Sequence, residues 1–405
     1  MAGSRRLWIV ILVFVVLAAC VLVYLFMTGE RGLSGSPAKA RQLDVTRLST
    51  AETERLGWDP ARLDAVFDHA AGLSSDVLMI VTEGRVVAAF GDTGKRYPVH
   101  SIRKSLLSAL IGQHLGSGPG QISLDATLEE LGIDDAPGPL TPLQKQAKVR
   151  HLLGNVSGIN HPAAAEAGLT AEKDRRLGKG ENTPGMVWAY NNWDHNVLTS
   201  IFEARSGLSV AEAFQTGIAN PLGLRDYTPD AVTYREEPAL SQHRAAAFQM
   251  SGRDLARFGQ LYLDKGLVGG EQILPAAWVE RIPAVAVATE IEGLRSGYSD
   301  LWWLPGPESG LPEGSFWAWG LGNQGLFVVP AWRSVIVHQA EMAEFLKRFF
   351  GLIEKDGMAP DAAIEQLALS CRKRANRASE FCVEHRFILR REFAELLSLI
   401  AQARR

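Results

Sequence analysis

The chain has 405 residues, of which 46% are hydrophobic and 21% are charged, and its formal net charge at pH 7 is −3. This length provides enough apolar material for one large domain or two, and the balanced charge gives no support to a nucleic-acid-binding protein. The three cysteines, Cys20, Cys371 and Cys382, are too few for a disulfide framework, and none belongs to a zinc-like cluster.

The first predicted element is an apolar helix near the N-terminus. Residues 7–27, LWIVILVFVVLAACVLVYLFM, contain no charge, and as a helix they would extend about 31 Å, close to the roughly 30 Å of a bilayer core. A lipoprotein box at LAAC or a cleaved signal peptide fits less well, because residues 21–27 remain apolar. Flanking basic residues do not decide the orientation. We expect a single-pass anchor, a cytosolic tail at 1–6 and a periplasmic or otherwise extracytoplasmic catalytic domain.

The next segments alternate between loop, helix and strand patterns. Residues 28–55, which contain TGERGLSGSPAKARQ, are typical of a linker. DPARLDAVFDHAAGL then has a helical period, and DVLMIVTEGRVVAAFGD contains two apolar runs around a turn, which predicts a hairpin. From residue 101 to about 285 the patterns are mainly helical, and strand character returns in GLFVVPAWRSVIVHQAE. Strands at both ends predict one sheet with an inserted, mainly helical lobe, within a domain at 56–355.

The C-terminal region is predicted to be helical. Residues 341–354 have the pattern of a helix that closes the sheet, and residues 356–405 form a basic extension. Residues 372–405 carry nine Lys or Arg against four Glu, which is typical of a solvated amphipathic helix, with a membrane-surface or partner contact as the alternative. Cys371 and Cys382 would lie about 16 Å apart along a continuous helix, too far for a disulfide unless the chain turns between them.

A candidate nucleophile lies in the segment HSIRKSLLSALIG, residues 100–112. Ser-x-x-Lys also occurs at Ser36 and Ser370, so the pattern alone is weak, but Ser101 follows a predicted hairpin and precedes an apolar helix. Residues three apart on a helix project from one face, so Lys104 can help to remove the proton from the Ser101 hydroxyl. The alternative is a helix-capping serine beside a solvated lysine.

A candidate partner lies 89 residues downstream, in YNNWDHNVL, where Tyr190 begins the chain's only Tyr-x-Asn. A tyrosine beside a lysine ammonium can be held partly as phenolate and act as a general base. For Lys104 alone to be neutral at pH 7, its pKa would have to fall by about three units from roughly 10.4, at a cost of about 4 kcal/mol. A Lys–Tyr pair can share that task. A buried tyrosine with a satisfied hydroxyl is the alternative for Tyr190.

Five ordered segments resemble the class C beta-lactamase-related serine hydrolases. This superfamily includes penicillin-binding D,D-carboxypeptidases, family VIII carboxylesterases and 6-aminohexanoate-dimer hydrolase. The resemblance covers residues 56–350 approximately, and it rests on HSIRKSLLSALIG, HLLGNVSGI, YNNWDHNVL, FQMSGRDLARFGQLYL and GLGNQGLFVVPAWRSVIV. It implies an α+β, beta-lactamase/transpeptidase-like fold, with an antiparallel sheet flanked by helices and an inserted lobe.

The resemblance also implies roles for individual residues. Ser101 would be the acylated nucleophile, Lys104 its activator and Tyr190 the general base. Asn192 would orient the substrate or Lys104. The backbone N–H of Ser101 would form one half of an oxyanion hole, in which a lost donor costs about 3–4 kcal/mol in the transition state.

The chain departs from the family at its third motif, where many members place Lys-Thr-Gly or His-Thr-Gly. The matching stretch here is FWAWGLGNQG, and no Lys, Arg or His occurs between Trp302 and Val329. Gly320 is retained and permits close backbone approach, and the N–H of Leu321 would be the second oxyanion donor. The missing cation argues against beta-lactam or D-Ala-D-Ala recognition. Four tryptophans near this strand would line an aromatic substrate pocket, or would pack in the core: Trp302, Trp303, Trp317 and Trp319.

We therefore expect a membrane-anchored serine hydrolase that cleaves a small-molecule ester or amide through an acyl-enzyme at Ser101. The alternatives are a D,D-carboxypeptidase or beta-lactamase, and a catalytically silent scaffold that retains the fold. His195 follows Asp194, but there is no Gly-x-Ser-x-Gly elbow for a Ser-His-Asp triad. The sequence also lacks His-Glu-x-x-His, and we expect no metal and no organic cofactor.

Overall fold

The computed structural model describes most of the chain beyond the predicted linker. The described residues are 45–166, 170–284, 286–289, 293–354 and 387–405, together with Asp356, Met358, Ala363, Gln366, Leu367, Ser370, Cys371 and Cys382. The predicted tail at 1–6, the predicted anchor at 7–27 and most of the predicted linker lie outside these residues. None of the helices in the described ranges is both long enough and apolar enough to span a bilayer.

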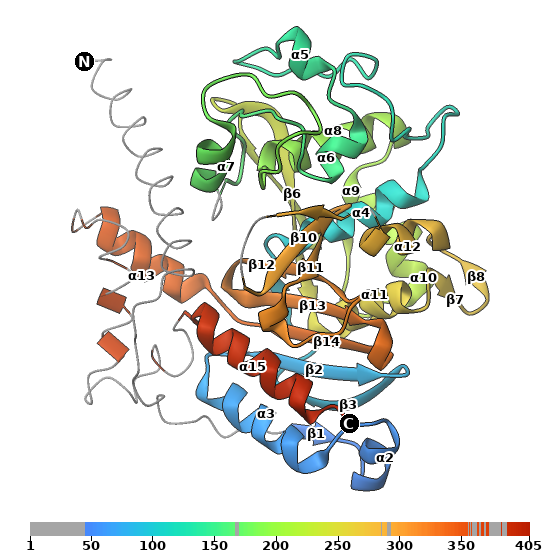
Figure 1. The fold of residues 1–405 in the computed structure, drawn as a ribbon, viewed down its shortest axis with the longest axis vertical. Coiled ribbons are helices and arrows are strands. Elements are labelled where there is room, and N and C mark those ends of the chain that lie inside the picture. Colours follow the sequence, from blue (N-terminus) through green and yellow to red (C-terminus); the bar gives the residue numbers. More distant parts are fainter. Residues whose placement is uncertain are drawn as a thin grey trace.

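A nine-stranded sheet forms the centre of the fold, in the order β1-β3-β2-β14-β13-β12-β11-β10-β9 (Figure 1). Every neighbouring pair is antiparallel, which confirms the predicted antiparallel sheet built from both ends of the chain. The strands are β1 (Val45–Arg47), β2 (Val77–Thr82), β3 (Arg85–Phe90), β9 (Val287–Ala288), β10 (Arg295–Ser299), β11 (Trp302–Pro305), β12 (Phe316–Gly320), β13 (Gln324–Val329) and β14 (Ser334–Gln339).

The predicted N-terminal hairpin is β2–β3. Its turn residues Glu83 and Gly84 both have positive φ, 51° and 72°, which is the backbone conformation that a tight two-residue hairpin turn requires. β2 joins the hairpin to the C-terminal strands, because it pairs with β14, with Ile80 opposite Ile336. All six residues of β2 are buried, because helices cover both faces of the sheet.

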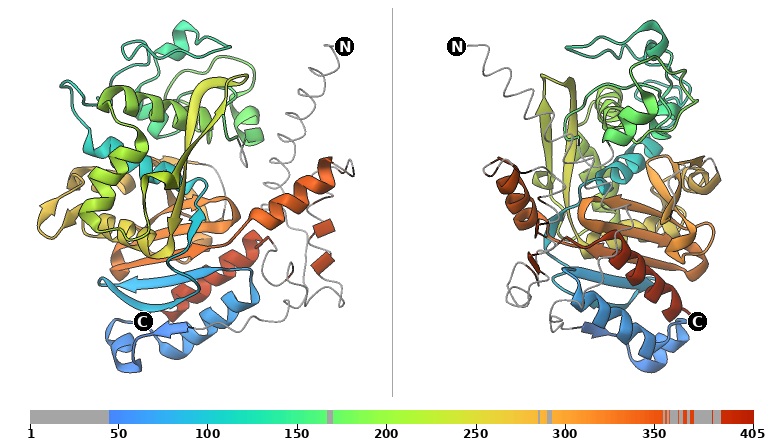
Figure 2. Two further views of the ribbon diagram at one scale, coloured as in Figure 1. Left: turned by 180° about the vertical axis from the view of Figure 1, so that it is seen from behind. Right: turned by 60° about the vertical axis from the view of Figure 1, so that its left-hand side comes forward.

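Helices pack on both faces of the sheet. On one face, α3 (Pro60–Gly72) and α15 (Arg390–Ala403) lie side by side (Figures 1 and 2). On the other face, α11 (Gly252–Leu263) packs on β13, β14 and β2. Along β13 successive side chains alternate between these layers, so that Phe327 contacts Phe393 of α15, whereas Leu326 approaches Gly259 of α11. The core therefore lies on both sides of the sheet.

The structure differs from the predicted organisation at both ends of the domain. Residues 45–55, expected in the linker, form β1 and α2 (Thr50–Arg55). The helix that covers the sheet beside α3 is α15, which was assigned to the C-terminal extension, because its residues Phe393, Leu396, Leu397 and Ile400 form one buried apolar stripe. The helix at 341–354 exists as α13 (Ala343–Glu354), and its Phe345 and Phe349 belong to a second apolar cluster with Cys382.

A disulfide links Cys371 to Cys382 next to that cluster, with Cα atoms 5.2 Å apart. The estimate of about 16 Å for these two residues assumed a continuous helix. At the observed Cα separation of 5.2 Å the two cysteines lie within the range of a disulfide. Three cysteines therefore provide one crosslink, which composition did not predict.

The inserted lobe lies above the sheet in Figure 1 and contains strands as well as helices. A three-stranded antiparallel sheet, β4-β6-β5, runs through it, with β6 packed against α8. Its strands are β4 (Arg96–Pro98), β5 (Val232–Glu237) and β6 (Ser241–Ser251). Its helices are α5 (Pro142–Lys145), α6 (Val149–Leu153), α7 (Thr170–Leu177), α8 (Asn192–Ser206) and α9 (Val210–Phe214), with a 3₁₀ turn at Pro229–Ala231. A π-helical turn at Gln215–Ala219 leads from α9 to α10 (Asn220–Leu222), which contacts α11 beside the large sheet.

One buried helix, α4 (Ile102–Gln113), connects the lobe to the sheet. It contacts β12 and β13 of the large sheet, and α8, α9 and β6 of the lobe. Residues that begin α4 therefore lie where the two parts of the domain meet. The remaining short elements are β7 (Leu267–Val268), β8 (Glu271–Gln272), α12 (Ala276–Ala284) and 3₁₀ turns at Pro307–Ser309, Leu321–Asn323 and Pro330–Trp332.

Candidate active site

Ser101 is the residue immediately before α4. The preceding His100 has a φ of 48°, a left-handed conformation that is uncommon for a residue with a side chain and turns the chain sharply into the helix. The Ser101 side chain makes no capping hydrogen bond to α4. The hydroxyl is thus left for other chemistry, and the helix-capping alternative does not apply.

Lys104 lies one turn along α4 and contacts both predicted partners. Its Nζ atom donates a hydrogen bond to Ser101 Oγ at 2.8 Å and another to the Tyr190 hydroxyl at 2.5 Å. The same Nζ atom lies 4.4 Å from the centroid of the Tyr190 ring. Lys104 is only 2% exposed, which excludes a solvated lysine. The structure therefore brings the three predicted groups into one hydrogen-bonded chain.

Burial shifts the pKa values of Lys104 and Tyr190. Burial, reinforced by the neighbouring Arg103 guanidinium, lowers the pKa of Lys104 well below its ordinary value. Burial raises the pKa of Tyr190 to about 12, against smaller opposing effects of the Ser101 hydroxyl and two arginines. Both shifts favour the uncharged forms, an amine beside a phenol, over the ammonium–phenolate pair considered from the sequence.

Tyr190 is held by the segment HLLGNVSGI. Asn155, with a φ of 55°, accepts a hydrogen bond from the Ala189 backbone N–H at 2.9 Å, and its side chain accepts one from the Asn191 N–H at 3.4 Å. The Asn191 side chain then caps α8 by accepting from the Trp193 N–H at 3.0 Å. These bonds fix the backbone on both sides of the tyrosine.

Asn192 lies beside the site but faces a neighbouring loop. Its amide nitrogen donates to the backbone oxygen of Ala165 at 2.9 Å, and its amide oxygen lies 3.4 Å from His195 Nδ1. Within the described part of the chain it makes no hydrogen bond to Lys104. Asn192 is thus bonded to the loop that contains Ala165. No hydrogen bond among the described residues supports its expected role in orienting Lys104.

Gly320, at the end of β12, touches the turn that carries Ser101. A Cβ atom placed on Gly320 would lie 2.4 Å from the backbone oxygen of Val99 and 3.3 Å from His100 Cβ, so no larger residue fits without displacement. Leu321 begins a 3₁₀ turn directly after it. The N–H groups at Ser101 and Leu321 both lie at starts of helical turns, where N–H groups lack an intrahelical acceptor.

An aromatic wall surrounds Tyr190. The Trp303 ring stacks on the tyrosine at a centroid distance of 5.3 Å, and Tyr298 meets it edge-on at 5.9 Å. Trp303 thus lies at the site, whereas the Trp319 ring packs against Trp317 at 5.2 Å and against Phe393 of α15 at 5.9 Å. Trp302 packs in the core against Tyr262 at 4.6 Å, and Trp317 is fully buried against Phe327 at 4.8 Å. Of the four tryptophans, Trp303 therefore contacts the candidate catalytic tyrosine, and the other three contact rings of the core.

Sequence reasoning missed a cation at this wall. The Cζ atom of Arg295, on β10, lies 4.5 Å from the ring centroids of both Trp303 and Trp319. The search for a cation considered residues between Trp302 and Val329, and Arg295 precedes that interval. Only the pairing of β10 with β11 and of β11 with β12 brings it to the site.

His195 does not form a Ser-His-Asp triad. Its Nε2 atom lies 2.9 Å from Asn155 Nδ2, and burial lowers its pKa well below the usual range. Asp194 instead accepts a hydrogen bond from the Ser157 hydroxyl at 2.6 Å, and burial raises its pKa well above the ordinary value. Burial also lowers the pKa of His100 to about 4. Both histidines are neutral near pH 7.

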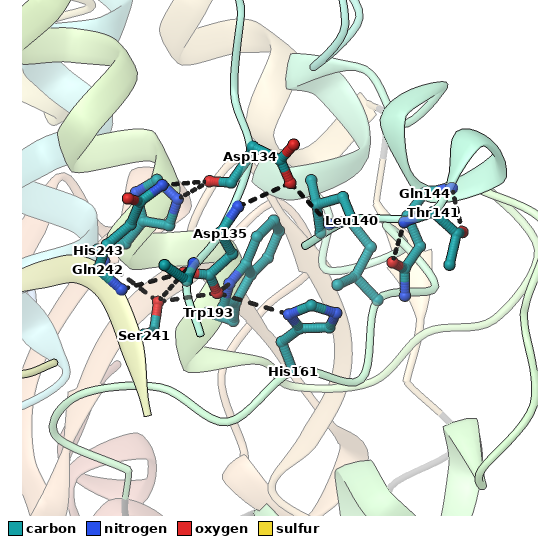
Figure 3. Close-up of polar contacts among 12 residues, drawn as sticks. Asp134, Asp135, Leu140, Thr141, Gln144, His161, Trp193, Ser241, Gln242 and His243 are labelled. Atoms are coloured by element: carbon teal, nitrogen blue, oxygen red, sulfur yellow. Dashed lines mark hydrogen bonds and ion pairs between the residues drawn. The ribbon is translucent and has the colours of Figure 1, made fainter. Parts of the chain in front are cut away.

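A second polar cluster, centred on Asp135, is structural (Figure 3). Its carboxylate accepts hydrogen bonds from Trp193 Nε1 at 2.6 Å, from the Ser241 hydroxyl at 2.9 and 3.0 Å, and from the Gln242 N–H at 3.0 Å. Burial opposes ionisation, but donors led by His161 hold the pKa at about 2. The cluster ties α8 to β6. Across the described ranges, no three His, Cys, Asp or Glu side chains are grouped as they would be to hold a metal ion.

A lobe inserted in an antiparallel sheet, with a serine and a lysine at the start of the connecting helix, defines a class of serine hydrolases. The chain matches the Beta-lactamase family over residues 62–339 and belongs to that family. It is 26% identical over 330 residues to the 6-aminohexanoate-dimer hydrolase of Paenarthrobacter ureafaciens, covering 72% of this chain and 81% of that protein.

Solved structures share the fold at lower identity. A putative 6-aminohexanoate-dimer hydrolase from Bacillus anthracis superposes with a TM-score of 0.51 at 22% identity, covering 83% of this chain and 86% of that one. The octameric penicillin-binding protein homologue from Pyrococcus abyssi has a TM-score of 0.51 at 19% identity, with coverages of 76% and 81%. These structures confirm the beta-lactamase-like α+β fold, and the match over residues 62–339 confirms the predicted family.

Proposed function

We propose that the protein is a serine hydrolase that cleaves an ester or amide bond through an acyl-enzyme at Ser101. The observation that carries this proposal is the position of Lys104 Nζ, which contacts Ser101 Oγ at 2.8 Å and the Tyr190 hydroxyl at 2.5 Å. A neutral amine at this position can accept the serine proton, which is the activation that a hydroxyl nucleophile requires.

In the acylation step, Ser101 Oγ attacks the substrate carbonyl carbon while its proton passes to the Lys104 amine. The backbone N–H groups of Ser101 and Leu321 stabilise the oxyanion of the tetrahedral intermediate. As the bond to the leaving group breaks, the Tyr190 phenol donates its proton to the departing oxygen or nitrogen, and the Lys104 ammonium returns a proton to Tyr190. Water then attacks the acyl-enzyme with the same pair acting as base, which releases the acid and restores Ser101.

The substrate that this arrangement suits is a small molecule with an ester or amide bond. The name of the Paenarthrobacter relative, 6-aminohexanoate-dimer hydrolase, supports an amide among the substrates. The neutral strand at Ala318–Gly320 and the tryptophans beside it support an ester or amide with apolar character near the bond.

Labelling with a fluorophosphonate probe tests the proposal directly. Wild-type protein should be labelled, Ser101→Ala should not, and Ser370→Ala, which removes the serine of another Ser-x-x-Lys, should be labelled normally. Turnover of p-nitrophenyl esters, p-nitroanilides and nitrocefin then ranks the bond types. A folded wild type without labelling or turnover would favour the scaffold alternative, and efficient nitrocefin hydrolysis would favour the beta-lactamase alternative.

We further propose that residues 7–27 anchor the protein in a membrane and that the catalytic domain lies outside the cytoplasm. The uncharged length of this segment supports the anchor. The Cys371–Cys382 disulfide supports an oxidising compartment. Membrane fractionation of full-length protein, followed by protease treatment of spheroplasts, should show a membrane-bound chain cleaved from outside. A chain that remains in the soluble fraction, or that is protected from protease, would contradict this topology.

A further inference from the structure

Arg103 directly precedes the proposed base on α4 and is buried with it. Arg103 is 6% exposed and Lys104 is 2% exposed. The motif SIRK therefore places two basic residues side by side in the interior of the protein, within one helical turn of Ser101. The reaction proposed above uses only the lysine, and it leaves the burial of the arginine without a role.

The Arg103 guanidinium has a neutral partner. It donates a hydrogen bond to Asn196 Oδ1 of α8 at 3.0 Å, and an amide oxygen carries no formal charge. Among the residues that the structure describes, no Asp or Glu forms an ion pair with Arg103. Burial lowers the pKa of Arg103 to about 10, so the guanidinium remains a cation at neutral pH. Burying a charge without a counter-ion costs stability, and such groups cluster at functional sites.

The nearest titratable neighbours of Lys104 favour their uncharged forms. Burial raises the pKa of Tyr190 to about 12, lowers that of His195 well below its usual range and lowers that of His100 to about 4. Further groups act on these neighbours or on Arg103 from other elements: Asp194 on α8, Tyr298 and Arg295 on β10, Arg235 on β5, and Glu341 after β14. Of all these groups, Arg103 alone shifts the pKa of Lys104 itself, and it lowers that pKa.

The remaining elements that pack on α4 bring no charge to Lys104. β12 and β13 carry no titratable side chain. The titratable side chains of α9 and β6 bond to other residues of the lobe: Glu212 to Ser209, His243 to Ser200, and Arg244 to Glu203. The guanidinium of Arg103 is therefore the charge that bears most directly on the amine.

A cation beside a buried amine disfavours the ammonium form, because two positive charges repel each other strongly where water is excluded. We infer that Arg103 is a positioning residue that acts through Lys104: its charge, left without a counter-ion, holds the lysine in the amine form that accepts the Ser101 proton. The same repulsion favours the later transfer of that proton from the ammonium to Tyr190. This inference rests on the proposed function and assigns the electrostatic control of its base.

The pH dependence of Ser101 labelling tests the inference. The rate constant for labelling by a neutral fluorophosphonate should decline in wild type as the pH falls through the lowered pKa of Lys104. Arg103→Gln removes the charge and keeps an amide that can donate to Asn196, and the acidic limb should move up by about one pH unit. At a pH on the acidic limb of both proteins, labelling of the variant should be about 10-fold slower. Arg103→Lys retains the charge, so its limb should stay close to that of wild type.

Two variants of Asn196 test the same charge without altering Arg103. The carboxylate of Asn196→Asp would pair with the guanidinium and offset its charge, so the acidic limb should again move up. Asn196→Ala is the matched control, because it removes the same hydrogen bond but adds no charge, and its limb should not move. Both variants lose the bond from Asn196 Nδ2 to the Ala164 backbone oxygen at 3.0 Å, so the difference between them isolates the charge.

Three results would overturn the inference. The first is a limb at the same pH in wild type and in folded Arg103→Gln. The second is the absence of a limb in Arg103→Gln across the pH range in which it is folded, because burial alone would then keep the amine neutral. The third, which decides if Arg103→Gln does not fold, is a limb that is equal in Asn196→Asp and Asn196→Ala. In each case, labelling of wild type and not of Ser101→Ala keeps the proposed function. If Ser101 is labelled at no pH, the proposed function itself is rejected.

Discussion

Lys104 Nζ lies 2.5 Å from the hydroxyl oxygen of Tyr190, although 86 residues separate the two in the chain. Lys104 lies on α4, and Tyr190 lies two residues before the first residue of α8. The contact therefore exists only because α4 and α8 pack together. Both groups are buried, and their exchange of a proton with Ser101 is the central step of the proposed reaction. The predictions below test this pair and the structure that holds it.

Removing the Tyr190 hydroxyl should slow the reaction without unfolding the protein. Tyr190→Phe keeps the ring stacked on Trp303 and deletes only the proton donor, so kcat should fall by about 10²–10⁴-fold while the melting temperature changes little. Tyr262→Phe removes a buried hydroxyl from a ring that packs on Trp302 in the core, and it should leave kcat unchanged. Steady-state kinetics and thermal denaturation of both variants make the comparison. A Tyr190→Phe enzyme with wild-type kcat would remove Tyr190 from the mechanism.

Activity should fall as the pH is lowered. The proposed base is the neutral Lys104 amine, whose pKa is held well below the ordinary 10.5 by burial and by Arg103. The rate constant kcat/KM should therefore be at its plateau under mildly alkaline conditions and decline when the pH drops through the lowered pKa. The full pH profile with a neutral ester measures this. An acidic limb centred near the ordinary lysine value would contradict a neutral resting amine.

The free energy of unfolding should also depend on pH through the lowered pKa of Lys104. Between the lowered pKa of the folded state and the ordinary 10.5 of the unfolded chain, the unfolded lysine is protonated and the folded one is not. The unfolded state thus binds more protons, and the free energy of unfolding should rise with pH across this window. Lys104→Met should lack this contribution and should be more stable than wild type near neutral pH. Urea denaturation at several pH values measures the free energy of unfolding of both proteins. If it changes with pH equally in wild type and Lys104→Met, the expectation is wrong.

The buried carboxyl of Asp194 should make the free energy of unfolding fall, and not rise, as the pH increases. Its pKa is raised well above 3.8 by burial, so the folded state holds a proton that the unfolded state releases. Stability should therefore decrease as the pH rises from about the ordinary value to the raised one. Asp194→Asn keeps an oxygen to accept from the Ser157 hydroxyl and replaces the titratable oxygen Oδ2 by an amide nitrogen that does not titrate. This variant should abolish the slope, and denaturation curves that still show it would assign the slope to another group.

Gly320→Ala should damage the site, because its Cβ atom would lie 2.4 Å from the Val99 backbone oxygen. Either β12 or the Ser101 turn must move, and such overpacking costs about 1–3 kcal/mol. We expect a lower melting temperature and a larger relative loss of kcat than of stability. Gly180→Ala is the control, since no atom lies within 4 Å of its added Cβ. Wild-type kinetics in Gly320→Ala would show that this contact does not position the nucleophile.

Much of the architecture could be predicted from local patterns. The β2–β3 hairpin follows from two apolar runs around Glu83-Gly84, and the C-terminal strands follow from similar runs near Pro330. The assignment of the covering helix differed, because 341–354 and 390–403 have similar apolar periodicity. Only packing against α3 distinguishes them. The long β5–β6 hairpin was absorbed into a mainly helical lobe, because its alternation is weak over residues that face solvent.

The amino-acid sequence by itself determined which residues meet at the start of α4. Ser101 and Lys104 are three residues apart, and the helix period alone brings them to one face. The tertiary structure alone decided the lowered pKa of Lys104, the disulfide partner of Cys371 and the position of Arg295 beside Trp303. Each depends on contacts between segments far apart in the chain, and burial in those contacts shifts pKa values and places charges in ways that local spacing does not specify.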